Sequence, residues 1–270
     1  MKPAPFDYVR AESLDEALDV LGREGGDARV IAGGQSLMPM LNMRLAKPRV
    51  LVDIMRLGEL AKIEGVASAV TVGAGVRQAA LLAWRELEAR LPMIALGLPL
   101  AGHPQTRSRG TVCGSIAHAD PSAELPLIVL ALSGEVHLRN RKRRRRVAAQ
   151  DFFVGMMATT RGDDALIEAV SFPVASRRCA FREVARRPGD FAIVACAAVG
   201  TDRGVRLAVG GVADMPMARD FPPLDGSALD DALNVFAYDL GARDDLHASA
   251  RYRRDLVRSI GRDLIGEVLQ

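Results

Sequence analysis

Two short runs of small residues are the part of the sequence whose composition best suits ligand binding. They are Ala32-Gly33-Gly34-Gln35-Ser36 and Thr111-Val112-Cys113-Gly114-Ser115, and each is expected to follow a strand. Glycine beside a hydroxyl residue lets main-chain N–H groups converge on an anion without obstruction by a Cβ, and a helix start behind the first run adds a favourable dipole. One such loop is common in ordinary turns. Two of them indicate a cradle for a diphosphate.

Other nucleotide-binding and catalytic signatures are incomplete in this sequence. Gly73-Ala74-Gly75 has Gln78 where a Rossmann fingerprint needs its third glycine, and the Gly-Lys-Ser/Thr of a P-loop does not occur. Ser36 and Ser115 lack the GxSxG context of a hydrolase nucleophile. A dinucleotide held by two separate loops stays open as an interpretation, and no catalytic residue is predicted.

The residues that commonly bind metals are too few and too scattered to predict a metal site. The chain has 3 cysteines, Cys113, Cys179 and Cys196, and 4 histidines without ligand spacing. Neither zinc nor an iron–sulfur cluster is therefore expected on this chain, and a redox cofactor here should be organic. His118 beside Asp120 is interpreted as a structural loop residue rather than a general base.

The first glycine run lies in a small predicted α/β layer. Ser13-Leu14-Asp15-Glu16 is a capping box, and apolar residues at helical spacing follow it up to Gly25. A β-prone run at 28–32 precedes the glycines, helical character follows at 37–45, and the next strand is predicted at 50–54. This order of strand, loop, helix and strand predicts an α/β subdomain.

The following residues surround the second glycine run with a mixture of helices and strands. Helices are predicted at 77–90, 91–101 and 122–132, an ordered loop at 110–124, and strands at 70–73, 135–139, 145–147 and 166–172. Pro173 ends the last strand and places the domain boundary at 173–178.

The last part of the chain has the pattern of a separate α+β domain. Strands at 180–185, 192–201 and 205–212 are predicted to form an antiparallel meander, followed by helices at 229–238 and from 246 onward.

Composition agrees with a water-soluble protein of two domains. The chain has 270 residues, 49% apolar and 26% charged, which is enough to bury substantial cores. Lys and Arg number 36 against 33 for Asp and Glu, and this small excess does not predict a nucleic-acid partner. The apolar stretch 125–132 is far shorter than the about 20 residues of a membrane span. Residues 1–25 contain no signal-peptide core, so no membrane span and a cytoplasmic location are expected.

A basic run at 139–146 interrupts this otherwise balanced charge distribution. Its place between two predicted strands indicates a solvated hairpin tip, and no aromatic residue is interleaved for base stacking. A role in docking an acidic partner subunit stays open. A non-catalytic protein that binds nucleic acid through this turn is the competing interpretation from another functional class.

Both glycine runs and their flanks resemble the FAD-binding medium subunits of molybdenum hydroxylases. That family includes the flavoprotein subunits of carbon monoxide dehydrogenase, xanthine dehydrogenase and the bacterial nicotine and caffeine dehydrogenases. The resemblance extends almost end to end, and it is specific because many landmarks occur together. They are VIAGGQSLMP at 30–39, DI at 53–54, GHPQ at 102–105, RSR at 107–109, GTVCGSIAHADP at 110–121, DFF at 151–153, RRPGDFA at 186–192, GGV at 210–212 and DLHASA at 245–250.

This resemblance implies an α+β fold with one noncovalently bound FAD. Residues 1–174 would form an FAD-binding domain of the vanillyl-alcohol-oxidase (PCMH) type, with subdomains at about 1–56 and 57–174, and 175–270 a small α+β C-terminal domain. The diphosphate would lie against 30–37 and 111–115, and the flavin ring near the loop at 101–103. The implied FAD-binding residues are Val30, Ile31, Ala32, Gly33, Gly34, Gln35, Ser36, Leu37, Ala101, His103, Gly110, Thr111, Gly114, Ser115, Asp120, Glu124, Ile167, Arg182 and Phe191.

Among these residues, Asp120 and Glu124 would accept hydrogen bonds from ribityl or ribose hydroxyls. Ile167, Arg182 and Phe191 would border the isoalloxazine. Three positions depart from the family pattern. Cys113 stands where relatives usually have glycine, Arg182 replaces a frequent lysine, and Phe191 replaces a tyrosine found in some relatives. These departures concern details of the site rather than the family.

The resemblance also implies a role in electron transfer. In a heterotrimeric molybdenum hydroxylase, a molybdopterin-binding large subunit would oxidise the substrate and a small subunit with two 2Fe–2S clusters would carry electrons to this chain. FAD here would deliver them to a terminal acceptor, and the complex would be a dimer of heterotrimers. The alternative is a stand-alone FAD-dependent oxidase or reductase of the same fold.

Overall fold

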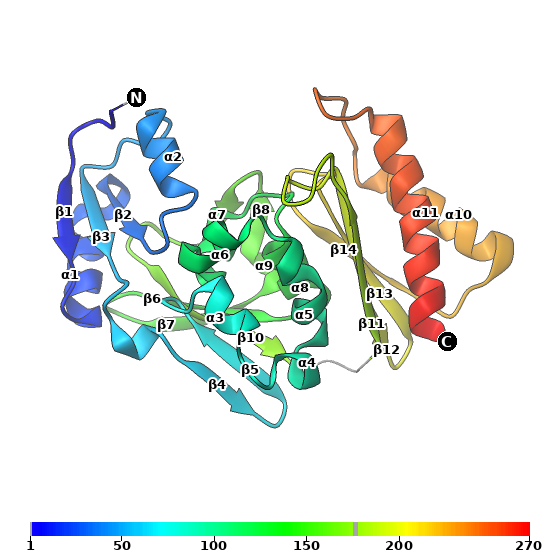
Figure 1. The fold of residues 1–270 in the computed structure, drawn as a ribbon, viewed down its shortest axis with the longest axis horizontal. Helices are drawn as coiled ribbons and strands as arrows, with labels where there is room; N and C mark the ends of the chain where they lie inside the picture. Colours follow the sequence, from blue (N-terminus) through cyan, green and yellow to red (C-terminus); the bar gives the residue numbers. More distant parts are fainter. Residues whose placement is uncertain (1, 175–177) are drawn as a thin grey trace.

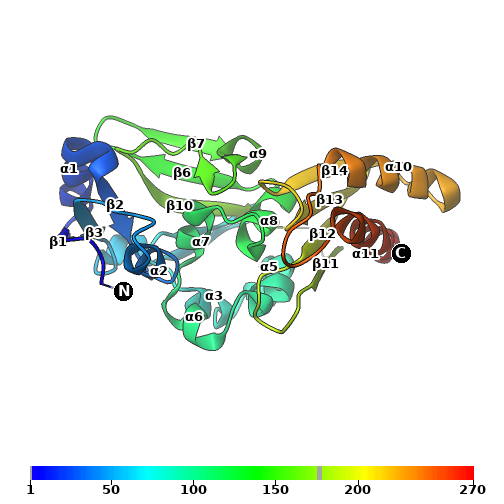
Figure 2. The ribbon, with the colours of Figure 1, turned by 90° about the horizontal axis from the view of Figure 1, so that it is seen from above.

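The computed structural model describes residues 2–174 and 178–270, which form three units in a row along the molecule (Figure 1). Each unit is built on its own sheet, and the five-stranded sheet stands between the other two (Figure 1). Seen from above, the helices α10 and α11 lie beyond the last sheet, at the end opposite to α1 (Figure 2).

The first unit is a three-stranded parallel sheet with the strand order β1-β3-β2. Its elements are β1 (Asp7–Arg10), α1 (Leu14–Glu24), β2 (Ala28–Ile31), α2 (Leu37–Asn42) and β3 (Val50–Asp53). Because the strands are parallel, their carboxyl ends meet at one edge, where Ile31 pairs with Asp53 and the first glycine run begins. Open α/β sheets bind ligands at this edge. The expected elements are confirmed, and β1 is an addition that the sequence pattern did not predict.

Helix α1 begins at the predicted capping box and covers the sheet. The Ser13 hydroxyl accepts a hydrogen bond from the Glu16 N–H at 3.1 Å, and Gly25 ends the helix at φ +53°. The apolar face of α1 is buried against β2 and β3. Its outer face carries the exposed carboxylates of Asp15 and Asp19.

The second unit is a five-stranded antiparallel sheet, in the order β4-β5-β10-β6-β7, packed against short helices. Its strands are β4 (Ile63–Val66), β5 (Ala69–Gly73), β6 (Glu135–Arg139), β7 (Arg144–Ala148) and β10 (Leu166–Pro173). Its helices are α3 (Gln78–Leu82), α4 (Leu87–Arg90), α5 (Pro92–Gly97), α6 (Pro104–Arg109), α7 (Val112–His118), α8 (Glu124–Ala131) and α9 (Ala149–Phe152). A small ribbon of β8 (Phe153–Gly155) and β9 (Ala158–Thr159) follows α9.

Two predictions for this unit are wrong. The helix expected at 77–90 is split into α3 and α4, and the break at 83–86 lets Trp84 pack against the core. The loop expected at 110–124 contains α7, so the second glycine run is the first turn of a helix preceded by α6, not a loop after a strand. Glycine, serine and threonine are weak helix formers, and α7 is stabilised instead by burying Val112, Cys113 and Ile116.

The third unit is an antiparallel meander of four strands covered by two helices. Its elements are β11 (Cys179–Val184), β12 (Val194–Thr201), β13 (Gly204–Gly210), β14 (Met217–Phe221), α10 (Gly226–Asp239) and α11 (Ala250–Leu269). The three expected strands and both helices are confirmed. The fourth strand, β14, was not predicted, because proline and charged residues interrupt its alternation.

Strand β12 is buried on both faces and joins the second and third units. Ala195, Ala197 and Val199 belong to the core that also fills the first and second units, whereas Val194, Cys196 and Ala198 belong to the core beneath α10 and α11. This alternation follows from the two-residue period of a strand. Alanines on one face let α8 approach β12 and β13 closely.

The domain boundary predicted at 173–178 includes residues 175–177, which lie outside the described residues. Within the described ranges, no helix combines the length and apolar character needed to cross a bilayer.

Candidate functional site

A pocket of about 610 Å³ lies at the seam between the first and second units. We use the word seam for the boundary between residues 2–56 and 57–174. The first unit contributes the glycine run from Ile31 to Gln35, and the second contributes Arg77 and Arg109. The other residues of its wall are Tyr8, Met38, Pro39, Asn42, Asp53 and Met55. The pocket therefore opens at the carboxyl edge of the parallel sheet.

The first glycine run needs both of its glycines for this geometry. Gly34 adopts φ +71°, a conformation that side chains with a Cβ rarely adopt. Gly33 packs directly on the second unit, since a Cβ there would lie 2.2 Å from the Arg109 carbonyl oxygen and 2.6 Å from the Gly110 Cα. The run thus joins the segment that leads into α7, and the structure brings the start of both predicted motifs together.

Four consecutive main-chain N–H groups in this run have no partner among the described residues, and three of them belong to residues that line the pocket, Gly33, Gly34 and Gln35. In the described part of the chain, the N–H groups of Gly33, Gly34, Gln35 and Ser36 make no hydrogen bond to protein atoms. Unpaired N–H groups in a glycine-rich turn are the usual binding site of a phosphate group. The arrangement suits a diphosphate rather than an uncharged ligand.

Charged side chains of the pocket agree with this interpretation. Neither Arg77 nor Arg109 makes an ion pair or a side-chain hydrogen bond with any described residue, so both guanidinium groups are available to an anion. Asp53, which also lines the pocket, accepts hydrogen bonds from the Tyr8 hydroxyl and, at 2.8 Å, from the Met55 N–H. The hydrogen bond to Asp53 raises the pKa of Tyr8.

Residues of the second glycine motif form hydrogen bonds within the protein. Thr111 Oγ1 accepts a hydrogen bond from the Gly114 N–H at 3.0 Å, and a Cβ at Gly114 would lie 2.7 Å from that oxygen. The Val112 N–H is bound to the Val76 carbonyl. Cys113 is helical and buried, so its Cβ causes no strain, and burial raises the pKa of its thiol to about 12. The main-chain N–H groups of the first run are thus more available than those of Val112 and Gly114.

A second group of predicted residues lies at the other end of α6. The Arg107 guanidinium donates to the carbonyls of Ala101 and Gly102 at 3.1 and 2.7 Å, which fixes the loop that precedes α6. Gly189 of the third unit packs against His103, because a Cβ there would lie 2.4 Å from the imidazole. A six-residue helix is about 9 Å long. Helix α6 therefore connects this group to Arg109 in the pocket.

Glu124 and Asp120 extend this second group. Glu124 is the first residue of α8 and is only 6% exposed. Burial raises its pKa to about 7, and the nearby carboxylates of Glu183 and Asp120 act in the same direction. Asp120 accepts a hydrogen bond from the Ser122 N–H at 2.9 Å. The charge of Arg107, which binds the loop of Ala101 and Gly102, acts on Glu124 in the opposite direction and so connects this carboxyl group with the second group of residues.

The remaining predicted residues lie in other surroundings. Arg182 forms ion pairs with Asp263 at 3.0 Å and Glu267 at 3.7 Å, which direct it to α11. Ile167 is buried in β10 beside an irregularity in its pairing with β6. Val30 belongs to β2 and Leu37 to α2, and neither lines the pocket. Phe191 is 68% exposed and lies two residues from Gly189 in the sequence. Their contacts with FAD stay predictions.

Sequence reasoning missed several residues of the pocket wall, most importantly Arg77, Arg109 and Asp53. Asp53 had a usable signal, since it ends a strand parallel to the one that precedes the glycine run. Arg109 directly precedes the second motif. Arg77 could not be found locally, because only the pairing of its segment with Thr111 brings it to the seam. Among the described residues, no group of three or more His, Cys, Asp or Glu side chains is arranged to hold a metal ion.

Comparisons with known proteins cover nearly the whole chain. The family model described as the FAD binding domain in molybdopterin dehydrogenase matches residues 4–175, and that of the CO dehydrogenase flavoprotein C-terminal domain matches residues 179–268. The nicotine 6-hydroxylase medium subunit of Paenarthrobacter nicotinovorans is 36% identical over 99% of this chain and 98% of its own length. The carbon monoxide dehydrogenase medium chain of Hydrogenophaga pseudoflava is 34% identical over 82% of this chain and 79% of its own.

The fold agrees with solved structures of the same group. Carbon monoxide dehydrogenase from Hydrogenophaga pseudoflava, in a form lacking the Mo-pyranopterin moiety of its cofactor, superimposes with a TM-score of 0.93 at 30% identity, covering 100% of this chain and 99% of that one. The chain belongs to the family of FAD-binding medium subunits of molybdenum hydroxylases. It is thus an oxidoreductase subunit with FAD as its cofactor, and the unpaired N–H groups, the glycines and the two arginines of the pocket fit the diphosphate of that cofactor.

Proposed function

We propose that this chain is the electron-transfer subunit of a heterotrimeric molybdenum hydroxylase. It would work between the two 2Fe–2S clusters of a small subunit and a terminal acceptor, while a molybdopterin-binding large subunit oxidises the organic substrate. The observation that carries the proposal is the seam pocket, which is lined by three residues with unpaired main-chain N–H groups and by two arginines that make no ion pair with any described residue. Relatives named as medium subunits of carbon monoxide dehydrogenase and nicotine 6-hydroxylase support the assembly.

The pocket residues would act as a diphosphate clamp. The N–H groups of Gly33, Gly34, Gln35 and Ser36 would bind phosphate oxygens, with Arg77 and Arg109 supplying positive charge from the second unit. FAD, when bound, supplies the redox chemistry. The chain's own part is to hold the cofactor and to exclude water from it.

Beyond the diphosphate, the group around α6 would hold the rest of the cofactor. Ala101 and His103 would lie near the ring, and Asp120 and Glu124 would accept hydrogen bonds from hydroxyl groups. The proximity of His103 to Gly189 supports a contribution from the third unit, to which Phe191 also belongs. Gly110, Thr111, Gly114 and Ser115 would complete the wall where the two units meet. We further propose that the complex is a dimer of heterotrimers located in the cytoplasm.

The purified chain tests this role directly. It should carry one FAD and reduce artificial acceptors when given an artificial electron donor, yet it should not oxidise an organic substrate alone. Turnover of an organic substrate by the isolated chain would instead establish a stand-alone FAD-dependent oxidase or reductase. Failure to copurify with molybdopterin and iron–sulfur subunits from its native source would contradict the proposed assembly.

Gly34→Val tests the placement of the diphosphate. Valine at φ +71° is strained and would meet Met38, so FAD affinity should fall at least about tenfold while the chain stays folded. Flavin fluorescence titration gives the affinity and circular dichroism gives the fold. Gly22→Val is the matched control, because Gly22 lies on α1 with open space around it. Full FAD occupancy of Gly34→Val would refute this placement.

A further inference from the structure

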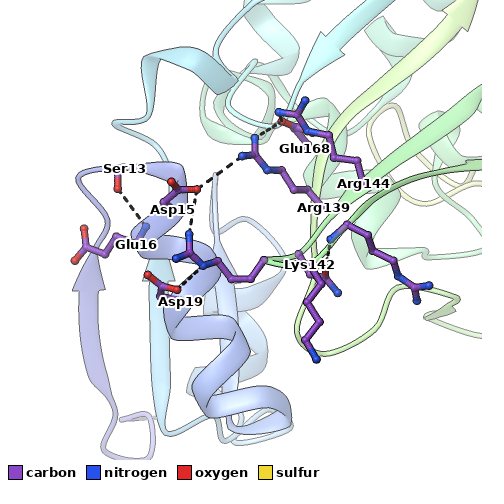
Figure 3. Close-up of polar contacts among 11 residues, drawn as sticks. Ser13, Asp15, Glu16, Asp19, Arg139, Lys142, Arg144 and Glu168 are labelled. Atoms are coloured by element: carbon purple, nitrogen blue, oxygen red, sulfur yellow. Dashed lines mark hydrogen bonds and ion pairs between the residues drawn. The ribbon is translucent and has the colours of Figure 1, made fainter.

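The basic turn between β6 and β7 reaches across the seam to helix α1. Arg141 lies 2.6 Å from an Asp19 carboxylate oxygen and 3.4 Å from one of Asp15, and Arg139 lies 3.7 Å from Asp15. Figure 3 shows the two aspartates of α1 facing this turn. A further pair, Arg29 with Asp163 at 3.4 Å, also joins the first unit to the second. Ion pairs therefore link the two units at more than one place.

The rest of the basic run is divided between internal partners and solvent. Arg139 and Arg144 bind Glu168 at 2.9 and 3.4 Å, within the second unit (Figure 3). Lys142 has no ion pair or side-chain hydrogen bond to any described residue, and its side chain points away from Asp15 and Asp19 in Figure 3. Arg141 is thus the residue of the turn that is committed to the first unit, and Lys142 is its unpaired neighbour.

These ion pairs span the same seam as the diphosphate pocket. The glycine run of the pocket belongs to the first unit, and Arg77 and Arg109 belong to the second. The separation of the two pocket walls therefore depends on how the units are held together. On the pocket side they meet at Gly33 and Arg109. On the α1 side they are held by exposed ion pairs, which are individually weak, gain strength as a network and are screened by salt.

We propose that Arg141, together with Asp15 and Asp19, is a positioning residue that holds the first unit against the second and so maintains the FAD pocket. We name these three residues the seam clamp. The clamp rests on the proposed placement of the FAD diphosphate between the glycine run and the arginines of the second unit. It makes the FAD affinity of the chain dependent on ionic strength through residues that do not touch the cofactor.

Two charge reversals on adjacent residues test the clamp. Arg141→Glu removes two ion pairs and adds repulsion, so the dissociation constant of FAD should rise about fivefold at low ionic strength. Lys142→Glu changes the net charge equally and should alter it less than about twofold. In about 1 M salt, where the Debye length is near 3 Å, the Arg141→Glu chain and the unmodified chain should converge. Equal effects of the two reversals would overturn the proposal.

A charge swap separates positioning from simple destabilisation. Asp19→Arg combined with Arg141→Glu restores one pair in the opposite sense and should recover at least about half of the lost free energy of FAD binding. A variant that lowers only the melting temperature of the FAD-free chain, with FAD affinity unchanged, would overturn the clamp alone. A double variant that is folded but does not recover affinity would do the same. Absence of FAD binding by the unmodified chain would overturn the proposed function instead.

Discussion

Glu124 places a carboxyl group in nearly complete burial at the start of α8. Burial raises its pKa to about 7, so the native chain holds a proton that the unfolded chain releases at a lower pH. The contribution of Glu124 to the free energy of unfolding is therefore present below about pH 4.5 and is lost as the pH rises to about 7. At about 1.4 kcal/mol per pKa unit, the upper limit of this loss is about 3 kcal/mol.

Glu124→Gln should reveal this loss in the FAD-free chain. Glutamine keeps a neutral side chain at every pH, so the variant should gain stability relative to the unmodified chain between about pH 5 and about pH 8. Urea denaturation at both values measures the difference. Glu59→Gln, at an exposed position, serves as the control and should show no such change. The same difference for Glu124→Gln at both pH values would contradict the assigned protonation.

At the residue level, sequence reasoning identified the glycine run but only part of the pocket. Gly33 and Gly34 could be found because adjacent glycines have a direct conformational meaning. Nothing in the sequence around Arg77 and Arg109 distinguishes them from other arginines, and only the folding of two units against each other brings them to a common pocket. Arg182, in contrast, was predicted to border the flavin ring, and the structure shows it in ion pairs with α11. These ion pairs depend on the face of β11 that Arg182 occupies, which the sequence pattern alone does not define.

Among the elements, α7 depends most on a single cap. The Thr111 hydroxyl satisfies the Gly114 N–H, and the helix has only one strong helix former, Ala117, to compensate for a loss of this bond. Thr111→Ala should therefore lower the free energy of unfolding by about 1–2 kcal/mol. Thr111→Ser keeps the oxygen and should retain most of it. Urea denaturation checks both, and equal losses would show that the buried methyl group matters more than the cap.

Element prediction succeeded where one periodic pattern extended over a whole helix or strand. The amphipathic face and the glycine stop of helix α1 act as expected. Of its capping box, the Ser13 bond forms, whereas the Glu16 carboxylate accepts from the Glu12 N–H and not from the Ser13 N–H. Helices α3, α4 and α7 have 4 to 7 residues, too few for a periodic signal. Strand β1 was missed because it has only 4 residues and is mostly exposed, and its pairing with β3 defines it.

For the whole molecule, the sharing of β12 between two cores predicts cooperation between the units. A fragment of residues 1–174 would expose the apolar surfaces of α5 and α8 that β11, β12 and β13 cover. Apolar patches of this kind promote association. The fragment should elute from size-exclusion chromatography as aggregates and bind a hydrophobic dye, whereas the full chain should do neither. A monomeric fragment that binds FAD normally would show that the third unit is dispensable for folding.

The sequence predicted the overall architecture better than it predicted the contacts between the units. The order of α/β layer, mixed unit and antiparallel meander was predictable from patterns and resemblance. The common core was not predictable, because the continuous apolar run at 194–199 indicates one buried strand whichever elements pack on its two faces. The position of the cut at 174/175 stays a prediction.

The row of alanines on β12 constrains how such a chain can change over evolution. The methyl side chains of these alanines let α8 pack directly on β12. A larger side chain on β12 would require a smaller side chain at the facing position of α8. Chimaeras that exchange the C-terminal half between relatives should consequently inherit mismatched surfaces unless α5 and α8 travel with it. Substitutions on the two sides of this contact are expected to have accumulated in pairs.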